Sequence, residues 1–373
     1  MAAVTLEHTD LRPDRGASLG PGDGPTLLVA STGGHLEQLL RLRDRLGPDA
    51  LGPTEWVTFD GNQSRALLRG ETVHHVDYIR PRDLGAALRA APAARRLLKQ
   101  GGYRAVVSTG AGIALPFFVA AAARRLPRYY IESAARSLGP SLTGRLVAAI
   151  PGTRLFTQYP SWADERWTYC GSLFDAFVPG VPDPSRRTDA PRRVVVTLGT
   201  MPDYGFRRAV ERLAHLLPQV CAPDAEVLWQ VGATDVTGLG VDGHVQVPAD
   251  KLRAAVREAD LVIAHGGIGS ALMALDAGRV PVLVPRRTGF GEHIDDHQAM
   301  ICGHLADRGI AVSREADELT ADDLLRAARA TVGASSRVTM RLTPSGSATP
   351  RGRRPDRTPF VMPRAAAAPR RIG

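Results

Sequence analysis

The stretch Leu261–Gln298 reads LVIAHGGIGSALMALDAGRVPVLVPRRTGFGEHIDDHQ and decides the fold of this chain. An apolar run enters a glycine-rich turn, a helix follows, and a second apolar run leads into a polar loop. A strand, a glycine turn and a helix in this order are how an α/β fold presents backbone N–H groups to a phosphate. The polar loop would emerge at the same sheet edge, where open α/β sheets bind their ligands. The stretch therefore predicts a site for a nucleotide-linked ligand.

The turn and the loop supply the candidate ligand contacts. The turn consists of His265, Gly266, Gly267, Gly269 and Ser270, and the loop carries Arg286, Arg287, Glu292, His293, Asp295, Asp296, His297 and Gln298. The glycines do not fit a dinucleotide fingerprint, because the G-x-G-x-x-G pattern from Gly267 requires a glycine where Leu272 stands. A purely structural tight turn is the alternative for the glycines alone, and the polar loop after the next strand favours a ligand.

Composition indicates a globular protein of about two domains in its 373 residues. Apolar residues make up 44% of the chain, which is ample for buried cores. The longest apolar run, Ile113–Ala123, is interrupted by Pro116 and is shorter than the ~20 residues of a membrane-spanning helix. The three cysteines, Cys170, Cys221 and Cys302, are far apart and form neither a disulfide framework nor a zinc pattern. With no signal-peptide pattern, a reducing cytoplasm is expected.

The formal net charge of +9 is concentrated at one end of the chain. Residues 334–373 contain nine arginines and one aspartate, a net charge of +8, which leaves +1 for residues 1–333. The folded part is thus nearly neutral, and the charge gives little support to a nucleic-acid-binding domain. No nucleic-acid partner is expected.

The first half of the chain predicts an α/β domain over residues 25–178, after a polar segment 1–24 that is expected to be disordered. Its first strand, Leu27–Ala30, leads into the turn Ser31–His35 and a helix over about Leu36–Leu46. A second glycine turn, Thr109–Gly112, follows the strand Ala105–Ser108 and precedes a helix that ends near Arg125. The other expected elements are strands Trp56–Phe59, Val73–Tyr78, Tyr129–Glu132 and Leu155–Gln158 and a helix around Asp83–Gln100.

A proline-rich segment, 179–191, is interpreted as a linker to a second α/β domain over 192–333. This domain begins with the strand Val194–Leu198 and the turn Gly199–Thr200. A helix Phe206–Leu217, a strand Glu226–Val231, a helix near Lys251–Glu258, the stretch quoted above and a helix near Ala321–Val332 complete it. Two Rossmann-like halves that face a central cleft are expected, followed by a disordered basic tail, 334–373.

The second half, about 192–330, resembles the donor domain of GT-B glycosyltransferases of the MurG-like family. The resemblance is closest to the bacterial exopolysaccharide branch related to the eukaryotic Alg-type UDP-GlcNAc transferase. Its matching pieces are Val196–Thr200, His265–Ser270, Val284–Arg287, Gly291–His293 and Asp296–Gln298. The first half looks like the acceptor partner of the same system, through Ser31–Glu37, Ser108–Gly112, Tyr130–Ser133 and Tyr169–Ser172. The two parts are often separate subunits, and here they are fused.

The resemblance implies a UDP-sugar as donor substrate, with neither a cofactor nor a metal. The turn before the helix would face the UDP diphosphate, and Gly199 and Thr200 would approach it from the other side. The implied donor-binding residues are Gly199, Thr200, His265, Gly266, Gly267, Gly269, Ser270, Arg286, Glu292, Asp296, His297 and Gln298. One position departs from the family pattern, since Met273 stands where a glutamate usually holds the ribose hydroxyls. Asp276 could replace it only with a shifted geometry.

An inverting transfer needs a base within hydrogen-bond reach of the acceptor hydroxyl. His35, at a strand-end turn, suits that task, and Glu37 is the competing candidate. Glu132, at another strand end, could orient the acceptor or His35. The alternatives are a capping or donor-stabilising role for His35, a surface acid matched to the helix dipole for Glu37, and a merely solvated Glu132. The acceptor-side loops are expected to contribute Gly33, Gly34, Thr109, Gly110 and Gly112.

Basic residues flank apolar segments of the first half and suggest contact with an anionic membrane surface. They are Arg80, Arg82, Arg89, Arg95, Arg96, Lys99, Arg124, Arg125 and Arg128. A helix that packs on the sheet with its other face solvated is the alternative. A polyprenyl-diphosphate-linked acceptor, implied by the family, would make such attachment useful.

These observations predict a cytoplasmic, peripherally membrane-associated, inverting glycosyltransferase. It would move a sugar from a UDP-sugar to a polyprenyl-diphosphate-linked saccharide in surface or exopolysaccharide biosynthesis. One alternative is a nucleotide-sugar epimerase of GT-B shape, which would need no lipid acceptor. The other is a non-catalytic donor-binding homologue, suggested by Met273 and the arginine-rich ending.

Overall fold

The computed structural model of the protein describes Leu19 and residues 23–80, 83–181, 190–294, 296–335 and 340–342. Most of the segment expected to be a disordered N-terminus, most of the linker and nearly all of the basic tail lie outside the described residues, as do Arg82 and Asp295. In the described part, no helix is both long and apolar enough to cross a membrane.

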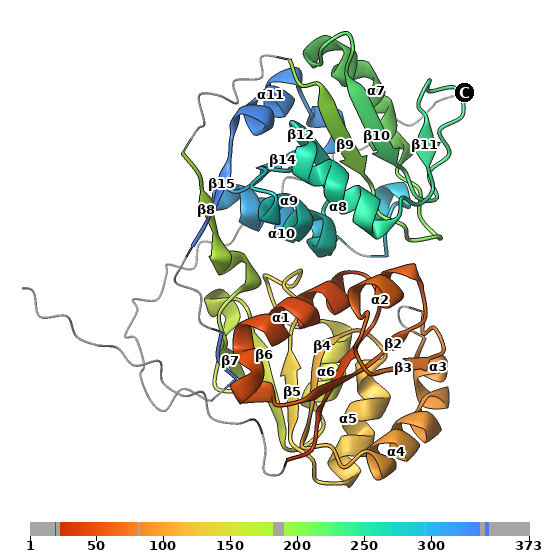
Figure 1. Ribbon diagram of the computed structural model, residues 1–373, viewed down its shortest axis with the longest axis vertical. Helices are drawn as coiled ribbons and strands as arrows, with labels where there is room; N and C mark the ends of the chain where they lie inside the picture. The colour runs from red at the N-terminus through yellow and green to blue at the C-terminus, as the bar shows by residue number, and fades with distance from the viewer. Residues whose placement is uncertain are drawn as a thin grey trace, which may run out of the picture. The chain divides into compact units, whose positions relative to one another are not determined.

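The first lobe, residues 23–181, is built on a seven-stranded sheet in which every neighbouring pair is parallel. Its strands are β1 (Thr26–Ala30), β2 (Thr54–Phe59), β3 (Val73–Val76), β4 (Ala105–Gly110), β5 (Arg128–Ile131), β6 (Thr153–Thr157) and β7 (Trp167–Tyr169). Their order is β3-β2-β1-β4-β5-β6-β7, so the winding reverses between β1 and β4 (Figure 1).

Six helices connect these strands: α1 (Gly34–Leu51), α2 (Asn62–Leu67), α3 (Leu84–Arg89), α4 (Ala91–Gln100), α5 (Ala114–Ala123) and α6 (Leu142–Ala148). Short 3₁₀ turns follow at Pro160–Trp162 and Leu173–Ala176. Helices cover both faces of the sheet. Successive residues of a strand point to opposite faces, so neighbouring strand residues pack against different helices. Leu28 of β1 packs in one core cluster with the α1 leucines Leu36 and Leu39, whereas Leu27 packs in another with Phe117 of α5.

The second lobe, residues 190–335, carries a six-stranded parallel sheet in the order β11-β10-β9-β12-β13-β14. The strands are β9 (Arg193–Thr197), β10 (Glu226–Gln230), β11 (Gly243–His244), β12 (Leu261–His265), β13 (Val282–Val284) and β14 (Val312–Ser313). The helices are α7 (Arg207–Val220), α8 (Ala249–Glu258), α9 (Ile268–Asp276), α10 (His297–Asp307) and α11 (Ala321–Arg329), with 3₁₀ turns at Thr288–Phe290 and Ala316–Glu318. The winding again reverses at the first strand, between β9 and β12, and the expected pair of Rossmann-like sheets is confirmed.

A short antiparallel ribbon joins the two lobes at a second place along the chain. β8 (Phe177–Pro179) pairs with β15 (Val332–Ala334), although the two strands are far apart in sequence. The chain then returns to the first lobe, where the Arg341 amide donates to the Cys170 carbonyl at 3.1 Å. Met340 and Leu342 are buried in the same core cluster as Cys170.

Three expected elements differ from the structure. The helix expected over Asp83–Gln100 is divided at Ala90, where Pro92 begins a new helix because proline lacks an N–H and fits only a first helical turn. The polar loop after β13 is shorter than expected, since His297 and Gln298 already form the first turn of α10. The last helix ends at Arg329, because the β-branched Thr331 and Val332 continue as an extended chain into β15.

Candidate active site

Turns at the two winding reversals carry most of the candidate residues. His35 follows β1 and Thr109 lies near the end of β4, while Gly199 follows β9 and His265 ends β12. The carboxyl ends of parallel strands at such a reversal form the crevice in which open α/β sheets bind ligands. The two crevices meet, because a Cβ atom placed on Gly34 would lie 3.6 Å from the Cβ of Ile268 and 3.9 Å from the amide nitrogen of Gly269.

His35 is held in one tautomer by Thr109. Its Nδ1 lies 2.9 Å from the Thr109 carbonyl oxygen, and the Thr109 hydroxyl donates to the His35 carbonyl at 2.9 Å. A carbonyl oxygen only accepts, so Nδ1 carries the proton and Nε2 keeps its lone pair. Burial lowers the His35 pKa to about 4; the Thr109 bond opposes this shift, and the nearby His297 and Arg136 add to it. The ring is therefore neutral at pH 7, with Nε2 as a proton acceptor.

Glycines give the His35 ring its space. Gly110 has a φ of 114°, and a Cβ atom there would lie 2.8 Å from the Tyr130 hydroxyl and 3.2 Å from Cε1 of His35. Gly112 packs against Ile79, where a Cβ atom would lie 3.2 Å from Cγ2. Gly33 faces open space and has a φ of 87°, a backbone conformation that favours glycine. Gly110 and Gly112 thus exclude side chains by close packing, whereas Gly33 supplies a backbone conformation.

The second lobe holds His265 in a similar way. Its Nδ1 lies 3.3 Å from the Thr197 carbonyl oxygen, which assigns the proton to Nδ1 and leaves Nε2 as an acceptor. A Cβ atom on Gly199 would lie 2.9 Å from the ring, and one on Gly267 would lie 2.3 Å from Nε2. Burial, followed by the charge of Arg286, lowers the His265 pKa to about 3. The neutral ring fits only because both neighbours are glycines.

The amino end of α9 is open for an anion. Gly267 caps the helix without a side-chain hydrogen bond, and the first intrahelical bond runs from the Ala271 amide to the Gly267 carbonyl at 3.0 Å. The amides of Ile268, Gly269 and Ser270 therefore have no acceptor within the helix. Position 269 has open space, whereas a Cβ atom on Gly266 would lie 2.7 Å from Sγ of Cys302. The turn thus packs tightly on α10 and leaves the helix end clear.

The Arg286 side chain stabilises the loops of the second lobe by donating to backbone carbonyls. Its guanidinium is buried and donates to the carbonyls of Tyr204 (2.8 Å), Leu198 (2.5 Å) and Glu292 (3.2 Å). Burial lowers its pKa to about 10, although the charge of Glu292 opposes the shift. Its backbone amide donates to Oε1 of Gln298 at 3.0 Å. Arg286 and Gln298 are therefore part of the wall of the site, and a direct donor contact for Arg286 stays a prediction.

Two carboxylates of the polar loop differ in exposure. Glu292 is buried and accepts from Nη2 of Arg208 at 3.1 Å and from the Arg287 amide at 3.0 Å. Asp296 is exposed and accepts from the Thr288 amide and hydroxyl at 3.0 and 2.9 Å.

The rim of the site also carries rings and a hydroxyl. The rings of His293 and His297 lie 4.8 Å apart, and Tyr204 stacks on His293 at 6.0 Å. Thr200 is exposed beside the Gly199 turn. The structure thus places Asp296, His297 and Thr200 at the rim and Glu292 in the wall.

The two candidate acids of the first lobe are occupied by internal partners. Glu37 accepts from Arg41 at 3.0 Å and from Arg253 of the second lobe at 3.1 Å. Glu132 is buried and accepts from the Ser133 amide (3.0 Å) and from the Ser141 amide and hydroxyl (2.9 and 3.1 Å). Burial raises the Glu132 pKa, and these hydrogen bonds oppose the shift. In this arrangement both acids hold neighbouring elements in place.

Sequence reasoning missed the partners of these acids. Arg41 lies four residues after Glu37 on α1, a spacing that predicts an ion pair from the sequence. Arg253 and Asp276 gave no such signal, because they reach Glu37 and Arg41 only through the tertiary fold. Met273 packs against the cluster that includes Val256 of α8, and both oxygens of Asp276 accept from Arg41.

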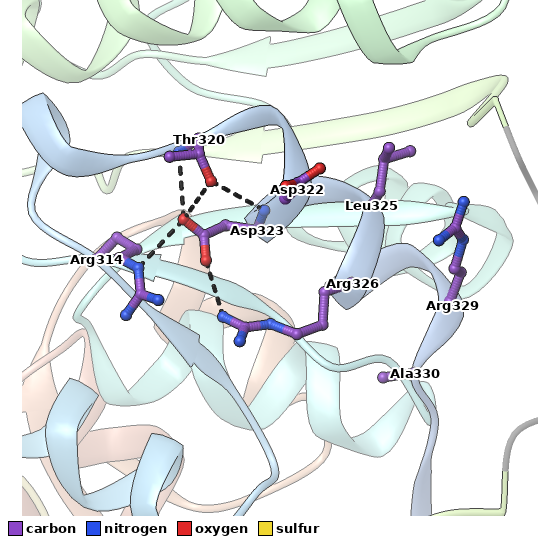
Figure 2. Close-up of a pocket in the computed structure, with 8 residues that line it drawn as sticks. All are labelled: Arg314, Thr320, Asp322, Asp323, Leu325, Arg326, Arg329 and Ala330. Carbon is purple, nitrogen blue, oxygen red and sulfur yellow. Dashed lines mark hydrogen bonds and ion pairs between the residues drawn. The ribbon is translucent and has the colours of Figure 1, made fainter.

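A cavity of about 680 Å³ lies on α11 and contains none of the candidate residues (Figure 2). Its lining residues are Arg314, Thr320, Asp322, Asp323, Leu325, Arg326, Arg329 and Ala330. Figure 2 shows the buried Asp323 carboxylate at the centre of a hydrogen-bond network with Thr320, Arg314 (3.2 Å) and Arg326 (2.8 Å). This network caps α11 and places two arginines on one buried carboxylate. Across the described ranges, no group of three His, Cys, Asp or Glu residues could hold a metal ion.

Comparison with known proteins identifies related sequences. The model of the glycosyltransferase family 28 C-terminal domain matches residues 193–332. A protein from Clavibacter michiganensis subsp. michiganensis is 32% identical over 288 residues, which cover 71% of this chain and 77% of that protein. A protein from Cupriavidus metallidurans is 26% identical over 287 residues, with 74% of each chain covered. Both are named UDP-N-acetylglucosamine–N-acetylmuramyl-(pentapeptide) pyrophosphoryl-undecaprenol N-acetylglucosamine transferase.

Solved structures share the fold. Acinetobacter baumannii MurG superposes with a TM-score of 0.53 at 22% identity, covering 81% of this chain and 88% of that one. The glycosyltransferase of kitacinnamycin gives a TM-score of 0.52 at 18% identity, covering 83% and 90%. These likenesses confirm the expected GT-B arrangement of two Rossmann-like domains.

Proposed function

Because the chain belongs to the MurG family of glycosyltransferases, glycosyltransferase family 28, we propose that it transfers a sugar from a UDP-sugar to a polyprenyl-diphosphate-linked saccharide. The acceptor hydroxyl attacks the anomeric carbon, the bond to the UDP oxygen breaks, and the configuration inverts. UDP leaves with the bonding electron pair, and a base takes the hydroxyl proton. The observation that carries the proposal is the meeting of the His35 turn with the open amino end of α9.

His35 is the proposed base. Nδ1 of His35 donates its proton in a hydrogen bond to the Thr109 carbonyl. The Nε2 lone pair is therefore free to accept a proton from the acceptor hydroxyl. The lowered pKa keeps His35 unprotonated at neutral pH, which is the state a base requires. Glu132 is proposed to have a positioning role, because it accepts hydrogen bonds from the Ser141 amide and hydroxyl and so fixes the loop before Ser141.

The amino end of α9 is the proposed diphosphate site. Free amides and the positive end of the helix dipole favour the phosphate charge, by up to about 2 kcal/mol in a partly buried geometry. The same amides stabilise the charge that develops on UDP as the bond breaks. Oε1 of Gln298 accepts from the Arg286 amide, which leaves the Gln298 NH₂ group to donate to a sugar hydroxyl, and Asp296 lies at the rim as a second contact.

The first lobe is proposed to attach to the cytoplasmic face of an anionic membrane. Exposed apolar side chains lie on or next to helices α3, α5 and α6: Leu88, Val119, Leu138 and Leu142. Exposed basic residues accompany them: Arg80, Arg89, Arg95, Arg96, Lys99, Arg124 and Arg125. Arg128 does not belong to this surface, because its buried guanidinium donates to the carbonyls of Leu126 and Pro151. Apolar side chains among basic ones suit insertion between anionic headgroups.

The proposed pathway is surface or exopolysaccharide assembly, through the resemblance to paired exopolysaccharide acceptor and donor subunits. The test incubates the purified protein and bacterial membranes with a panel of labelled UDP-sugars and follows label into the lipid fraction. Transfer of one sugar, together with UDP binding measured by calorimetry, is expected. Absence of both UDP binding and transfer to every acceptor would refute the proposal.

The same assay distinguishes the two alternatives. An epimerase would convert UDP-GlcNAc without any lipid acceptor. A non-catalytic homologue would bind UDP and transfer nothing, and Met273→Glu would then raise its affinity for UDP by restoring a ribose acceptor.

A further inference from the structure

Four charged side chains form one chain of hydrogen bonds between the lobes. Nη1 of Arg41 donates to Oδ1 of Asp276 at 2.9 Å, and Nη2 donates to the other carboxylate oxygen. Nη2 of Arg41 also donates to Glu37 at 3.0 Å, and Arg253 reaches the second oxygen of Glu37 at 3.1 Å. Glu37 and Arg41 belong to α1, whereas Arg253 belongs to α8 and Asp276 ends α9. We call these four residues the inter-lobe network.

The centre of the inter-lobe network is withdrawn from water and its ends are not, since the side chains of Asp276 and Arg253 are 44% and 37% exposed. The Glu37 side chain is 9% exposed and that of Arg41 is 16% exposed. Two positive and two negative charges balance, so no net charge is buried. Removal of Arg41 would leave the buried Glu37 carboxylate with Arg253 as its remaining partner, a larger loss than the breaking of a fully exposed pair.

The helices that the network joins are those that build the proposed site. His35 lies in the first turn of α1, only two residues before Glu37. The open amides proposed to bind diphosphate begin α9, the helix that Asp276 ends. A shift of α1 along α9 would therefore change the distance from Nε2 of His35 to the anomeric carbon of a donor bound at α9. A misplacement of about 1 Å between reacting groups can reduce a rate about a hundredfold.

We propose that Arg41 and Asp276, supported by Glu37 and Arg253, are positioning residues that set the catalytic register between the two lobes. This inference rests on the proposed function and deepens it. It assigns Glu37 to the alignment of α1 and leaves the proton to His35. It also commits Asp276 to Arg41 rather than to the donor ribose.

The test is a double-mutant cycle with Arg41→Gln, Asp276→Asn and the combined variant. Each single change should lower kcat about tenfold, and the combined variant should lose about the same, since both changes break one interaction. The Kd for UDP should stay within about twofold, because the α9 amides are untouched. Arg43→Gln is the matched control, an arginine of α1 whose ion pair with Glu71 stays within the first lobe, and it should leave kcat unchanged.

Three outcomes would overturn the inference. Single variants with full kcat would show that the pair sets no register, and a combined loss of about a hundredfold would show that the two residues act separately. A rise in the UDP Kd for Asp276→Asn alone would place this carboxylate on the ribose.

A structural readout separates this inference from the proposed function. The radius of gyration from small-angle X-ray scattering should increase in Arg41→Gln and Asp276→Asn and stay constant in Arg43→Gln. This measurement needs no activity, so an inactive wild-type protein would refute the proposed function and still test the network. An unchanged radius in both network variants would contradict the network.

Discussion

His35 and Thr109 exchange two hydrogen bonds, each 2.9 Å long, from the His35 ring to the Thr109 carbonyl and from the Thr109 hydroxyl to the His35 carbonyl. The exchange ties the turn after β1 to the end of β4 and fixes the ring through Nδ1. The Thr109 carbonyl, a backbone group that no side-chain substitution removes, thus orients the ring, while burial lowers its pKa.

His35→Asn should separate the roles of the two ring nitrogens of His35. The asparagine amide can replace the Nδ1 donor to Thr109, but it offers no acceptor at the position of Nε2. We expect kcat to fall by about 10²- to 10⁴-fold, the usual contribution of a general base, with the UDP Kd unchanged. Steady-state transfer kinetics and calorimetry measure the two quantities. A variant with wild-type kcat would exclude His35 as the base.

Acid should destabilise the protein through its two buried imidazoles. The folded state lowers the pKa of His35 to about 4 and that of His265 to about 3, whereas both titrate near 6.5 when unfolded. The unfolded state therefore binds more protons as the pH falls below about 6.5, and the free energy of unfolding drops by about 1.4 kcal/mol per pH unit for each proton. Above pH 7 neither group changes stability.

Urea unfolding at pH 7, 6 and 5 measures this slope. The His265→Asn variant lacks one of the two imidazoles that take up a proton on unfolding. Its free energy of unfolding should therefore fall less steeply, by about 1.4 kcal/mol per pH unit, at the acid end. Equal slopes for the variant and the wild type would contradict the assignment of a buried neutral ring to His265.

Gly267→Ala should lower the free energy of unfolding of the second lobe, whereas Gly269→Ala should not. The new methyl group at position 267 would lie 2.3 Å from Nε2 of His265, and the one at 269 would meet open space. We expect a loss of about 1–3 kcal/mol in the free energy of unfolding for the first change. The second should be neutral or stabilising by up to about 1 kcal/mol, because alanine favours the helix. Urea denaturation of both variants decides, and equal stabilities would rule out the close packing around His265.

Asp323→Ala should destabilise α11 by about 1–3 kcal/mol, since it removes a capping box together with the partners of Arg314 and Arg326. Its neighbour Asp322 lies in the same helical turn but is exposed, so Asp322→Ala should change stability by no more than about 0.5 kcal/mol. Thermal and urea unfolding of the two variants measure the difference. If the two substitutions cost the same, the buried network shown in Figure 2 does not hold the helix.

The architecture was largely predictable because its signals are local. Apolar runs that end in glycine turns mark β1, β4, β9 and β12, and these four strands define both winding reversals. The short outer strands β7, β11 and β14 were not predicted, since two or three residues carry no periodicity. The β8–β15 ribbon was also missed, because its strands lie far apart in the sequence and become neighbours only in the tertiary fold.

The sequence predicts the turns of the candidate site well, but it does not predict the partners of the charged side chains. The positions of His35, Gly199 and His265 follow from strand ends, which the sequence marks. The chain gives no signal that Arg286 donates to backbone carbonyls or that Arg253 reaches Glu37, because both depend on which elements become neighbours. A buried arginine and a ligand-binding arginine look alike in a sequence, so the donor contacts stay predictions.

The β8–β15 ribbon means that the peptide bond between the lobes is not their only attachment. Cutting the chain between residues 182 and 189 would leave one fragment with β8 and another that still carries β15, Met340 and Leu342. Strand pairing and the burial of these two side chains would hold such fragments together without a covalent link. The two pieces should therefore associate when they are co-expressed, and co-purification of the two fragments measures this.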